Sequence, residues 1–257
     1  MTRTVCIIPA RMDSSRFPGK PLANLLGMPL VLHVWHRCRL CTAFERVVVA
    51  TCDDEIRIAV EDAGGEAVMT ADTHERATDR TREAVANCGL GLADDDLVIM
   101  VQGDEVLMAP EMAEAIHTAY GQSRAPALNL GSRLTRTEDI DDPNVVKAVA
   151  APDGRVLYLS RAAIPSRTRG VDIPYYQQTG IMGFSAAFLN RFGDLPQTPL
   201  EIAESVDMLR VLEHGLVLQL VHTEAETIGV DTPADLVRAE KILATDPLTA
   251  LYSAEAA

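Results

Sequence analysis

The sequence contains no uninterrupted apolar run near the ~18 residues that a membrane span requires. Its N-terminus also lacks the long apolar segment of a secretory signal. The five cysteines are an odd number, which argues against a disulfide framework in a chain of 257 residues. Basic residues are few, with 23 Lys and Arg against 37 Asp and Glu, and the formal net charge is −14. Because so acidic a chain repels nucleic acid, we expect no nucleic-acid binding. Since neither a membrane span nor a secretory signal is found, we expect a cytoplasmic protein that does not insert into membranes.

Two glycine-rich phosphate-binding motifs are also absent. No GxGxxG fingerprint follows the first apolar run, residues 4–8, which disfavours a nicotinamide-dependent oxidoreductase. No GxxxxGK[ST] motif is present either, because Lys20 is followed by Pro21. The loop after the apolar run does carry charge, since it contains Arg11, Arg16 and Lys20. Guanidinium and ammonium groups bind anionic oxygens, so this loop predicts a phosphate site that is held partly by side chains.

Strand and helix signals alternate through the first half of the chain. Short apolar runs predict strands, and longer stretches with helical periodicity predict helices. This alternation predicts a mostly parallel, doubly wound α/β sheet of Rossmann-like type with helices on both faces. The expected strands are 4–8, 46–51, 66–69 and 97–102, and the expected helices are 29–40, 54–63, 77–88 and 110–120.

The rhythm changes after residue 134. Further strands are expected at 145–151, 156–159, 180–185 and 216–221, a helix at 199–214, and a last helix from Pro233 onward. Thr198 and Thr232 each precede a proline in the N-cap pattern of a helix. No linker divides the chain, so we expect a single domain, 1–257, with a smaller β-rich insertion at roughly 135–200.

Two aspartates follow or precede predicted elements in positions that suit a ligand site. Asp104 comes just after the buried run 97–102, and in open α/β sheets ligands bind beyond the carboxyl ends of the strands. A carboxylate beside a phosphate site suggests Mg²⁺, although Asp104 alone could simply cap a turn. Asp231 could be a capping acid at a helix N-terminus. Because Thr232 already fits the N-cap, with Pro233 at the first helical position, Asp231 is free for another role.

Several ordered motifs together resemble one family. Residues 7–21, IIPARMDSSRFPGKP, look like the opening motif of the sugar-acid cytidylyltransferases, and most closely that of the 3-deoxy-manno-octulosonate cytidylyltransferase family. The resemblance continues in the same order over nearly the whole chain. The matching segments are 48–51 with Asp53 or Asp54, 101–105, 144–147, 159–165, 199–201 with Glu204, 209–210, and 229–236.

This resemblance implies a nucleotidyltransferase fold and a Mg²⁺-dependent transfer of CMP from CTP to a sugar acid, with release of pyrophosphate. It also implies a homodimer, with the insertion at 135–200 contributing to dimerisation and sugar binding. Catalytic roles would fall to Arg11 and Lys20, which would hold the triphosphate, and to Asp104 and Asp231, which would hold the metal. The resemblance further implies nucleotide contacts by Ala10, Arg11, Ser14, Arg16, Lys20, Thr78, Arg80 and Gln102, and sugar contacts by Gln102, Arg161, Gln178, Met182, Glu201 and Glu204.

Three departures from the family pattern bear on the acceptor. Where the family has His-x-Ser-Gly-Thr-(Glu/Asp)-Arg, residues 74–80 carry Arg76 and Ala77. Val106 replaces a proline. Where the family has His-Leu-Gly-Ile-Tyr-Gly-Tyr, residues 178–184 lack the imidazole and both phenols. Unmatched buried polar groups discriminate strongly between substrates, so the reaction type is expected to survive while the acceptor stays open. Alternatives are an 8-amino sugar acid, a phosphonate, or an inactive nucleotide-binding module, against which the retention of both aspartates argues.

Overall fold

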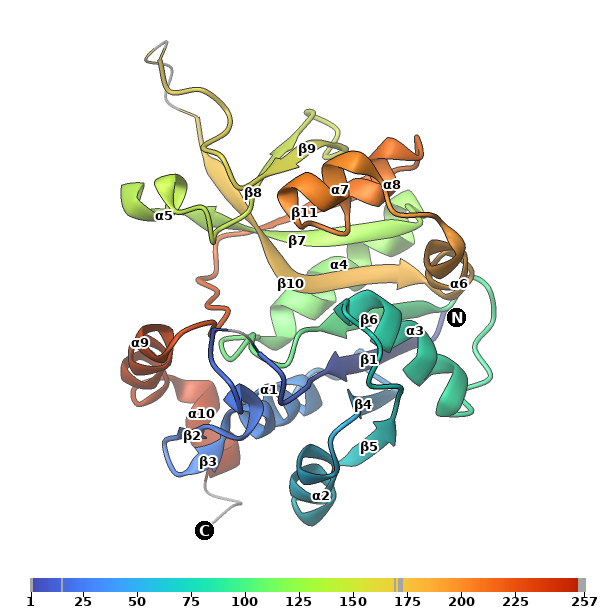
Figure 1. The fold of residues 1–257 in the computed structure, drawn as a ribbon, viewed down its shortest axis with the longest axis vertical. Helices are drawn as coiled ribbons and strands as arrows, with labels where there is room; N and C mark the ends of the chain where they lie inside the picture. The colour runs from blue at the N-terminus through green and yellow to red at the C-terminus, as the bar shows by residue number, and fades with distance from the viewer. Residues whose placement is uncertain (1, 15, 169, 171–172, 254–257) are drawn as a thin grey trace.

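A computed structural model of the chain describes residues 2–14, 16–168, 170 and 173–253. Within these residues one nine-stranded sheet runs through the molecule in the order β11-β7-β10-β6-β1-β4-β5, with β8 paired to β10 and β9 paired to β8 (Figure 1). The strands are β1 (Thr4–Pro9), β4 (Arg46–Thr51), β5 (Glu66–Met69), β6 (Leu97–Val101), β7 (Ala127–Leu134), β8 (Lys147–Ala150), β9 (Val156–Ser160), β10 (Tyr175–Ser185) and β11 (Leu218–Thr223). A separate two-stranded hairpin joins β2 (Asn24–Leu25) to β3 (Met28–Pro29).

The sheet is mostly parallel, as the alternation of signals predicts. Strands β5, β4, β1 and β6 pair in parallel, and so do β7 and β11. Strand β10 runs antiparallel between β6 and β7 and therefore joins the two parallel halves. Figure 1 shows β5, β4, β1 and β6 in one half of the molecule and β10, β7 and β11 in the other.

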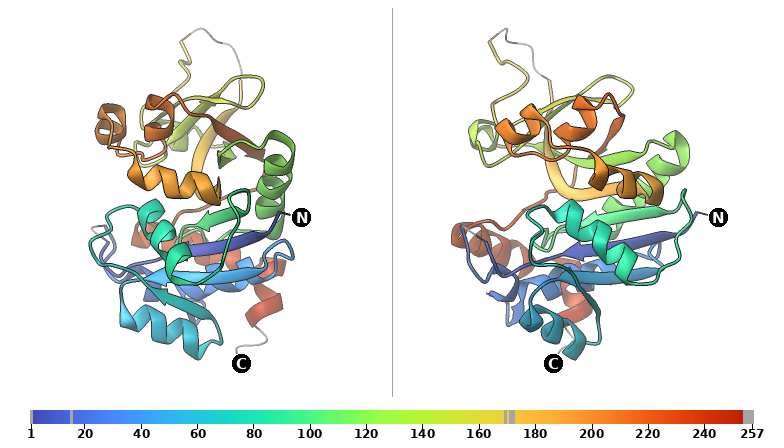
Figure 2. Two further views of the ribbon diagram at one scale, coloured as in Figure 1. Left: turned by 90° about the vertical axis from the view of Figure 1, so that its right-hand side faces the viewer. Right: turned by 45° about the vertical axis from the view of Figure 1, so that its right-hand side comes forward.

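Helices cover both faces of this sheet (Figure 2). The helices are α1 (Leu30–Arg39), α2 (Asp54–Asp62), α3 (Ala77–Asn87), α4 (Pro110–Ser123), α5 (Thr137–Asp141), α6 (Ala186–Asp194), α7 (Pro199–Glu204), α8 (Leu209–Glu213), α9 (Pro233–Leu243) and α10 (Pro247–Ser253), with a 3₁₀ turn at Lys20–Leu22.

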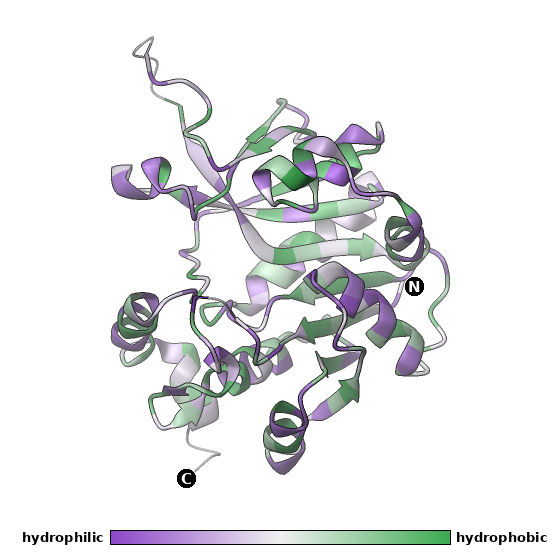
Figure 3. Cartoon of the chain, viewed as in Figure 1, coloured by the Kyte–Doolittle hydropathy of each residue, from purple (hydrophilic) through white to green (hydrophobic). Residues whose placement is uncertain are grey.

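Alternate side chains of β1 enter two separate cores, because Cys6 and Ile8 pack with α1, α4 and α9, whereas Val5 and Ile7 pack with α3, α6 and α8. Hydrophobic residues accordingly fill the central strands (Figure 3).

One expected helix is wrong. Residues 199–214 form two helices, α7 and α8, instead of one. Ser205 adopts a left-handed conformation, with φ of 51°, and the amide of Val206 donates back to the Glu201 carbonyl at 3.1 Å, which ends α7. Leu209 and Val211 of α8 are buried in the core, whereas Leu200 and Ile202 of α7 are exposed.

The second half of the sheet also differs from expectation. Strand β7 is not predicted at all, since Asn129 and Ser132 interrupt its apolar pattern although both are buried. Asn129 donates its side-chain amide to the carbonyls of Thr179 and Ile181, so the polar side chain belongs to the sheet. Strand β10 begins at Tyr175, five residues before the expected 180–185, and β8 is shorter than the expected 145–151. Helices α6 and α10 are further elements that the patterns did not indicate.

The fold brings several chain segments to one edge of the sheet. The loop after β1, the loop after β6 and the segment before α9 all meet there, and β10 passes beside them. Residues 135–200 contain α5, β8, β9, β10 and α6. Among the residues that the structure describes, no helix has the length and apolar character needed to traverse a lipid bilayer.

Candidate active site

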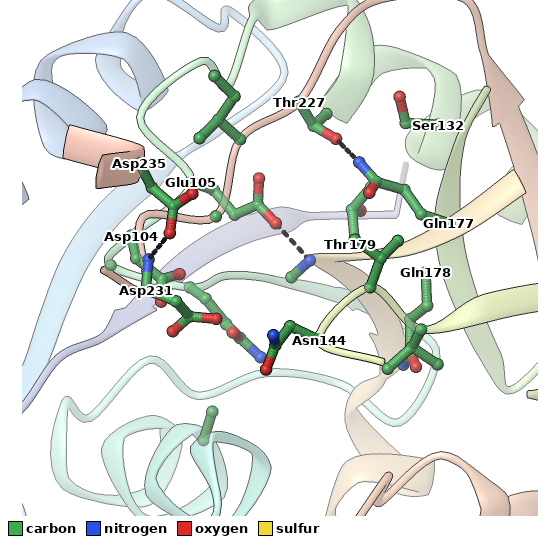
Figure 4. Close-up of a pocket in the computed structure, with 18 of the residues that line it drawn as sticks. Asp104, Glu105, Ser132, Asn144, Gln177, Gln178, Thr179, Thr227, Asp231 and Asp235 are labelled. Carbon is green, nitrogen blue, oxygen red and sulfur yellow. Dashed lines mark hydrogen bonds between the residues drawn. The ribbon is translucent and has the colours of Figure 1, made fainter. Parts of the chain in front are cut away.

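A cavity of about 1000 Å³ lies beyond the carboxyl ends of β1 and β6. Most of the predicted site residues line it, although they come from segments that are far apart in the sequence. Figure 4 shows Asp104 and Asp231 on one side of the cavity, and Gln177, Gln178 and Thr227 on the other. The predicted residues that line the cavity are Ala10, Arg11, Ser14, Arg16, Lys20, Arg80, Gln102, Asp104, Arg161, Gln178, Met182 and Asp231.

Two carboxylates at the edge of the cavity, those of Asp104 and Asp231, contact the same lysine. The Lys20 ammonium lies 2.6 Å from Asp104 Oδ2 and 3.2 Å from Asp231 Oδ1. The Arg16 guanidinium lies 2.8 Å from the other oxygen of Asp231. The backbone fixes the pair, because the amide of Val230 donates to the Asp104 carbonyl at 3.1 Å. The two aspartates that the sequence singled out are thus brought within reach of a single cation.

The electrostatics of this cluster favour a charged lysine. Burial by itself lowers the pKa of Lys20, but the adjacent Asp104 carboxylate, and then Asp231, outweigh it, and the net pKa is raised. Asp231 keeps its carboxylate for the cluster because Thr232 caps α9, accepting from the Asp235 amide in a capping box. This confirms the N-cap role expected for Thr232.

The loop after β1 is tied to its neighbours by backbone and side-chain contacts. The amide of Met12 donates to Asp53 Oδ2 at 2.8 Å, and Arg11 donates to the carbonyl of His74 at 3.2 Å. Gly103 packs so closely beneath the loop that a Cβ there would lie 3.1 Å from the Pro9 carbonyl oxygen. These contacts place the basic residues of the loop at the mouth of the cavity.

The segment before and within α3 forms a second basic wall. Arg80 is 2% exposed and donates to Thr70 Oγ1 at 2.5 Å, while its Nη2 is buried and has no hydrogen-bond partner among the described residues. An unpartnered buried guanidinium nitrogen on a cavity wall is available to a ligand. Thr78, expected to contact nucleotide, does not line the cavity and instead donates its hydroxyl to Asp207 at 2.6 Å.

Three residues expected to contact the sugar have partners within the protein. Glu201 is fully buried and forms a two-pronged ion pair with Arg210 at 2.8 and 2.5 Å. Glu204 accepts from the Ser160 hydroxyl and the Arg161 amide, at 2.6 and 2.9 Å. Neither glutamate lines the cavity, so their positions do not support sugar contact. Arg161 does line it, but its guanidinium donates to backbone carbonyls, including that of Pro143 at 2.9 Å.

The structure adds cavity residues that the motifs did not suggest. Asp207 lies in the break between α7 and α8, so the expectation of one helix concealed it. Arg76 was noted only as a departure, yet it lines the cavity with a buried Nε that has no partner among the described residues. Glu105 is 4% exposed, and its burial, followed by the nearby Asp104 charge, raises its pKa to about 7. The only signal for Glu105 was its place beside Asp104.

The fold and this cavity define an α/β enzyme built to hold a polyanion beside paired carboxylates. Residues 5–228 match the cytidylyltransferase family, and the chain belongs to that family of nucleotidyltransferases. It is 42% identical over 245 residues to a 3-deoxy-manno-octulosonate cytidylyltransferase of Syntrophus aciditrophicus, covering 95% of this chain and 98% of the relative. It is 40% identical over 244 residues to an 8-amino-3,8-dideoxy-manno-octulosonate cytidylyltransferase of Shewanella sp. strain ANA-3, covering 93% and 98%.

A solved structure agrees with the fold over the same length. The CMP:2-keto-3-deoxy-manno-octonic acid synthetase, determined in complex with CTP, superposes with a TM-score of 0.86 at 33% identity. The match covers 95% of this chain and 99% of that chain. The similarity therefore includes both halves of the sheet and the segments that line the cavity.

Proposed function

We propose that this enzyme transfers CMP from CTP to a 3-deoxy-manno-octulosonate-type sugar acid and releases pyrophosphate. The observation that carries the proposal is the convergence of Asp104 and Asp231 on one ammonium group at the edge of a large cavity, with Arg11 and Arg16 in the same wall. The relatives that cover almost the whole chain act on such acids by name. An inactive nucleotide-binding module would have no need of both carboxylates.

In the proposed reaction an acceptor hydroxyl oxygen attacks the α-phosphorus of CTP in line and loses its proton to solvent, and the new P–O bond forms as the bond to pyrophosphate breaks. Negative charge grows on the phosphoryl oxygens and on the leaving group. Arg11, Arg16 and Lys20 would hold and neutralise the triphosphate. An ammonium group has three N–H donors, so Lys20 can contact a phosphate oxygen while it still donates to the two carboxylates.

The carboxylate pair suits Mg²⁺, which we propose as the cofactor. Among the described residues no cluster of three or more His, Cys, Asp or Glu side chains forms a complete metal cage. Mg²⁺ needs none, because it typically binds one or two carboxylates and completes its shell with water and substrate phosphates. Asp104 and Asp231 would hold the ion, and the bound ion would supply charge neutralisation at the phosphates.

The acceptor wall distinguishes two candidate substrates. Met182 offers no strong hydrogen-bonding group, and Gln178 cannot carry a positive charge. We propose that the unmodified sugar acid is the weaker substrate and that a chemically altered acid, such as the 8-amino form, is preferred. Relatives are named for both acids, at 42% identity for the plain acid and 40% for the 8-amino acid, so the proposal rests on the residues of the wall. One unmatched buried polar group costs about 1–3 kcal/mol, which corresponds to roughly 5- to 150-fold in kcat/KM.

A pyrophosphate-release assay with CTP tests both proposals. The enzyme is supplied in turn with 3-deoxy-manno-octulosonate, its 8-amino-8-deoxy analogue and a phosphonate. Release with a sugar acid supports the transferase function, and a higher kcat/KM for the 8-amino analogue supports the acceptor assignment. Absence of release with every acid would refute the first proposal. A clear preference for the plain acid would refute the second, and would show that the changes at residues 178–184 are neutral.

We also propose a homodimer that forms through residues 135–200 and acts in the cytoplasm. Leu157 on β9 is 52% exposed and Ile173 is 42% exposed, so this segment presents apolar side chains that a second copy could cover. Light scattering after size-exclusion chromatography measures the molar mass directly. A monomer at micromolar concentration would contradict the dimer.

A further inference from the structure

Glu105 is a buried acid that the proposed reaction does not use. It directly follows Asp104, but its side chain is directed toward β10 (Figure 4). One carboxyl oxygen, Oε1, accepts a hydrogen bond from the Gly180 amide at 2.5 Å. The other, Oε2, is buried and has no hydrogen-bond partner in the part of the chain that the structure describes. Because burying an acid with half of its hydrogen-bonding capacity unused is costly, its presence calls for an explanation.

Both backbone polar groups of Gly180 are hydrogen-bonded. Its amide donates to Glu105, and its carbonyl accepts from the Gln102 amide at 2.9 Å. The space beside it is closed, since a Cβ on Gly180 would lie 2.9 Å from the Gln102 side chain. These contacts hold the backbone of Gly180 against the end of β6.

Gly180 lies where the regular pairing of β10 is interrupted. The register between β10 and β7 shifts between Gln178 and Met182, and there the side chain of Asn129 on β7 donates to the carbonyls of Thr179 and Ile181. On the β6 side, where the strand has ended at Val101, the Gly180 amide donates to Glu105 and not to a strand backbone. Gln178 and Met182, on either side of Gly180, both line the cavity.

Asp104 and Glu105 also hold the segment that carries Asp231. Glu105 forms a β-bridge with Gly229, and the Asp104 carbonyl accepts from the Val230 amide at 3.1 Å. The dipeptide 104–105 thus contacts both the irregular part of β10 and the chain leading to Asp231. A change in its side-chain contacts would alter the spacing between the acceptor wall and the carboxylate pair.

We propose that Glu105 is a positioning residue for the acceptor: its hydrogen bond to Gly180 sets the wall formed by Gln178 and Met182 at the distance from the carboxylate pair that the sugar acid requires. The inference rests on the proposed function and assigns Glu105 no contact with substrate. It follows that loss of the hydrogen bond weakens use of the acid and leaves CTP binding intact.

The test compares Glu105→Ala, Glu105→Gln and the control Glu111→Ala, which removes an exposed glutamate from the first turn of α4. In Glu105→Ala we expect the KM for the sugar acid to rise about tenfold, the scale of one lost hydrogen bond. Calorimetric affinity for CTP should stay within about twofold. Glu105→Gln keeps an oxygen that can accept from Gly180, so its KM for the sugar acid should lie near the wild-type value. The KM of Glu111→Ala should match the wild type.

A second variant covers the case in which Glu105→Ala fails to fold. Gly180→Ala displaces the same peptide from the Gln102 side and should raise the acid KM in the same way. An unchanged acid KM in Glu105→Ala or Gly180→Ala, an equal loss of CTP affinity, or a Glu105→Gln as impaired as Glu105→Ala would overturn the proposal.

Amide hydrogen exchange separates this inference from the proposed reaction, because it needs no turnover. We expect the Gly180 amide to be protected in the wild type, in Glu105→Gln and in Glu111→Ala, and to exchange faster in Glu105→Ala. If the wild type releases no pyrophosphate with any acid while this exchange pattern is found, the proposed function fails, but the positioning of Gly180 by Glu105 is supported. Equal exchange at Gly180 in all variants would refute that positioning.

Discussion

Replacing Lys20 by methionine tests the charge arrangement at the centre of the site. The change keeps a long apolar side chain and removes the ammonium that lies 2.6 Å from Asp104 and 3.2 Å from Asp231. Arg16 then remains as a counter-charge, and of the two carboxylates it contacts only Asp231. The variant should therefore hold two neighbouring carboxylates with too little positive charge between them.

The size of the effect follows from how exposed the three side chains are. Removing one partner of a buried ion pair costs about 3–5 kcal/mol, whereas a solvent-exposed pair contributes about 0–1 kcal/mol. The Lys20 side chain is 11% exposed, that of Asp104 is 18% and that of Asp231 is 34%, so this cluster lies between the two limits. We expect Lys20→Met to lower the free energy of unfolding by about 2 kcal/mol in the absence of divalent metal.

Magnesium should reverse much of that loss. A divalent cation can take the place between the carboxylates that the ammonium leaves, and a ligand at ten times its dissociation constant adds about 1.4 kcal/mol of stability. The wild type should gain less from Mg²⁺ without CTP, because there the ion must first displace Lys20. Pyrophosphate release by Lys20→Met should remain low at every Mg²⁺ concentration, since the cation meant for the triphosphate is missing.

Urea unfolding in EDTA and in Mg²⁺, at matched ionic strength, measures both effects. Arg57→Met is the control, because Arg57 forms ion pairs with Asp54 and Glu61 on the exposed side of α2. It should change stability by less than about 1 kcal/mol and show no additional response to Mg²⁺. The reasoning is refuted if Lys20→Met is as stable as the wild type in EDTA, or if both proteins gain equally from Mg²⁺.

Asp104→Asn and Asp231→Asn should each lower kcat at least about 100-fold with an unchanged circular dichroism spectrum; near-normal turnover at ordinary Mg²⁺ would show that the residue is not a metal ligand. Glu201→Gln should lower the free energy of unfolding by about 3 kcal/mol, because it removes the charge paired with buried Arg210, and leave the acid KM unchanged; a raised KM with unchanged stability would instead indicate sugar contact. Burial, assisted by a nearby arginine, holds the pKa of His33 below 6.5. The native state therefore binds this proton less readily than the unfolded state, so stability falls as the pH drops below 6.5, and His33→Gln should weaken that dependence in urea titrations between pH 7.5 and 5.5.

The first half of the fold could be predicted because β1 and β6 are buried on both faces and β4 is mostly buried. Residues 46–51 and 66–69 are found with the expected bounds, and α2 ends at Asp62, one residue before the expected end, with Gly64 at φ of 79° just beyond it. Strand β7 was missed because its buried polar residues depend on hydrogen bonds to distant segments. Asn129, for example, bonds to carbonyls of β10 some fifty residues away. Local patterns do not contain that information.

The site shows the same division between local and long-range information. Asp104 and Asp231 could be proposed because each stands beside an element boundary that the sequence marks clearly. The roles of Glu201 and Glu204 depended on which neighbours surround them, and burial with Arg210 or Ser160 is a property of the folded chain alone. The unused oxygen of Glu105 likewise becomes visible only once its surroundings are known.

The antiparallel strand β10 limits how this enzyme can move. It is hydrogen-bonded to β6 on one side and to β7 on the other, so the two halves of the sheet form one continuous ladder. Rotation of one half against the other would have to break that ladder over the contacts from residues 181 to 185. The two halves of the sheet are therefore expected to move as one body, and closure around substrates is expected of the loops at the cavity edge. The hydrogen bond from the Val230 amide to the Asp104 carbonyl would keep Asp104 and Asp231 at their spacing during such a movement.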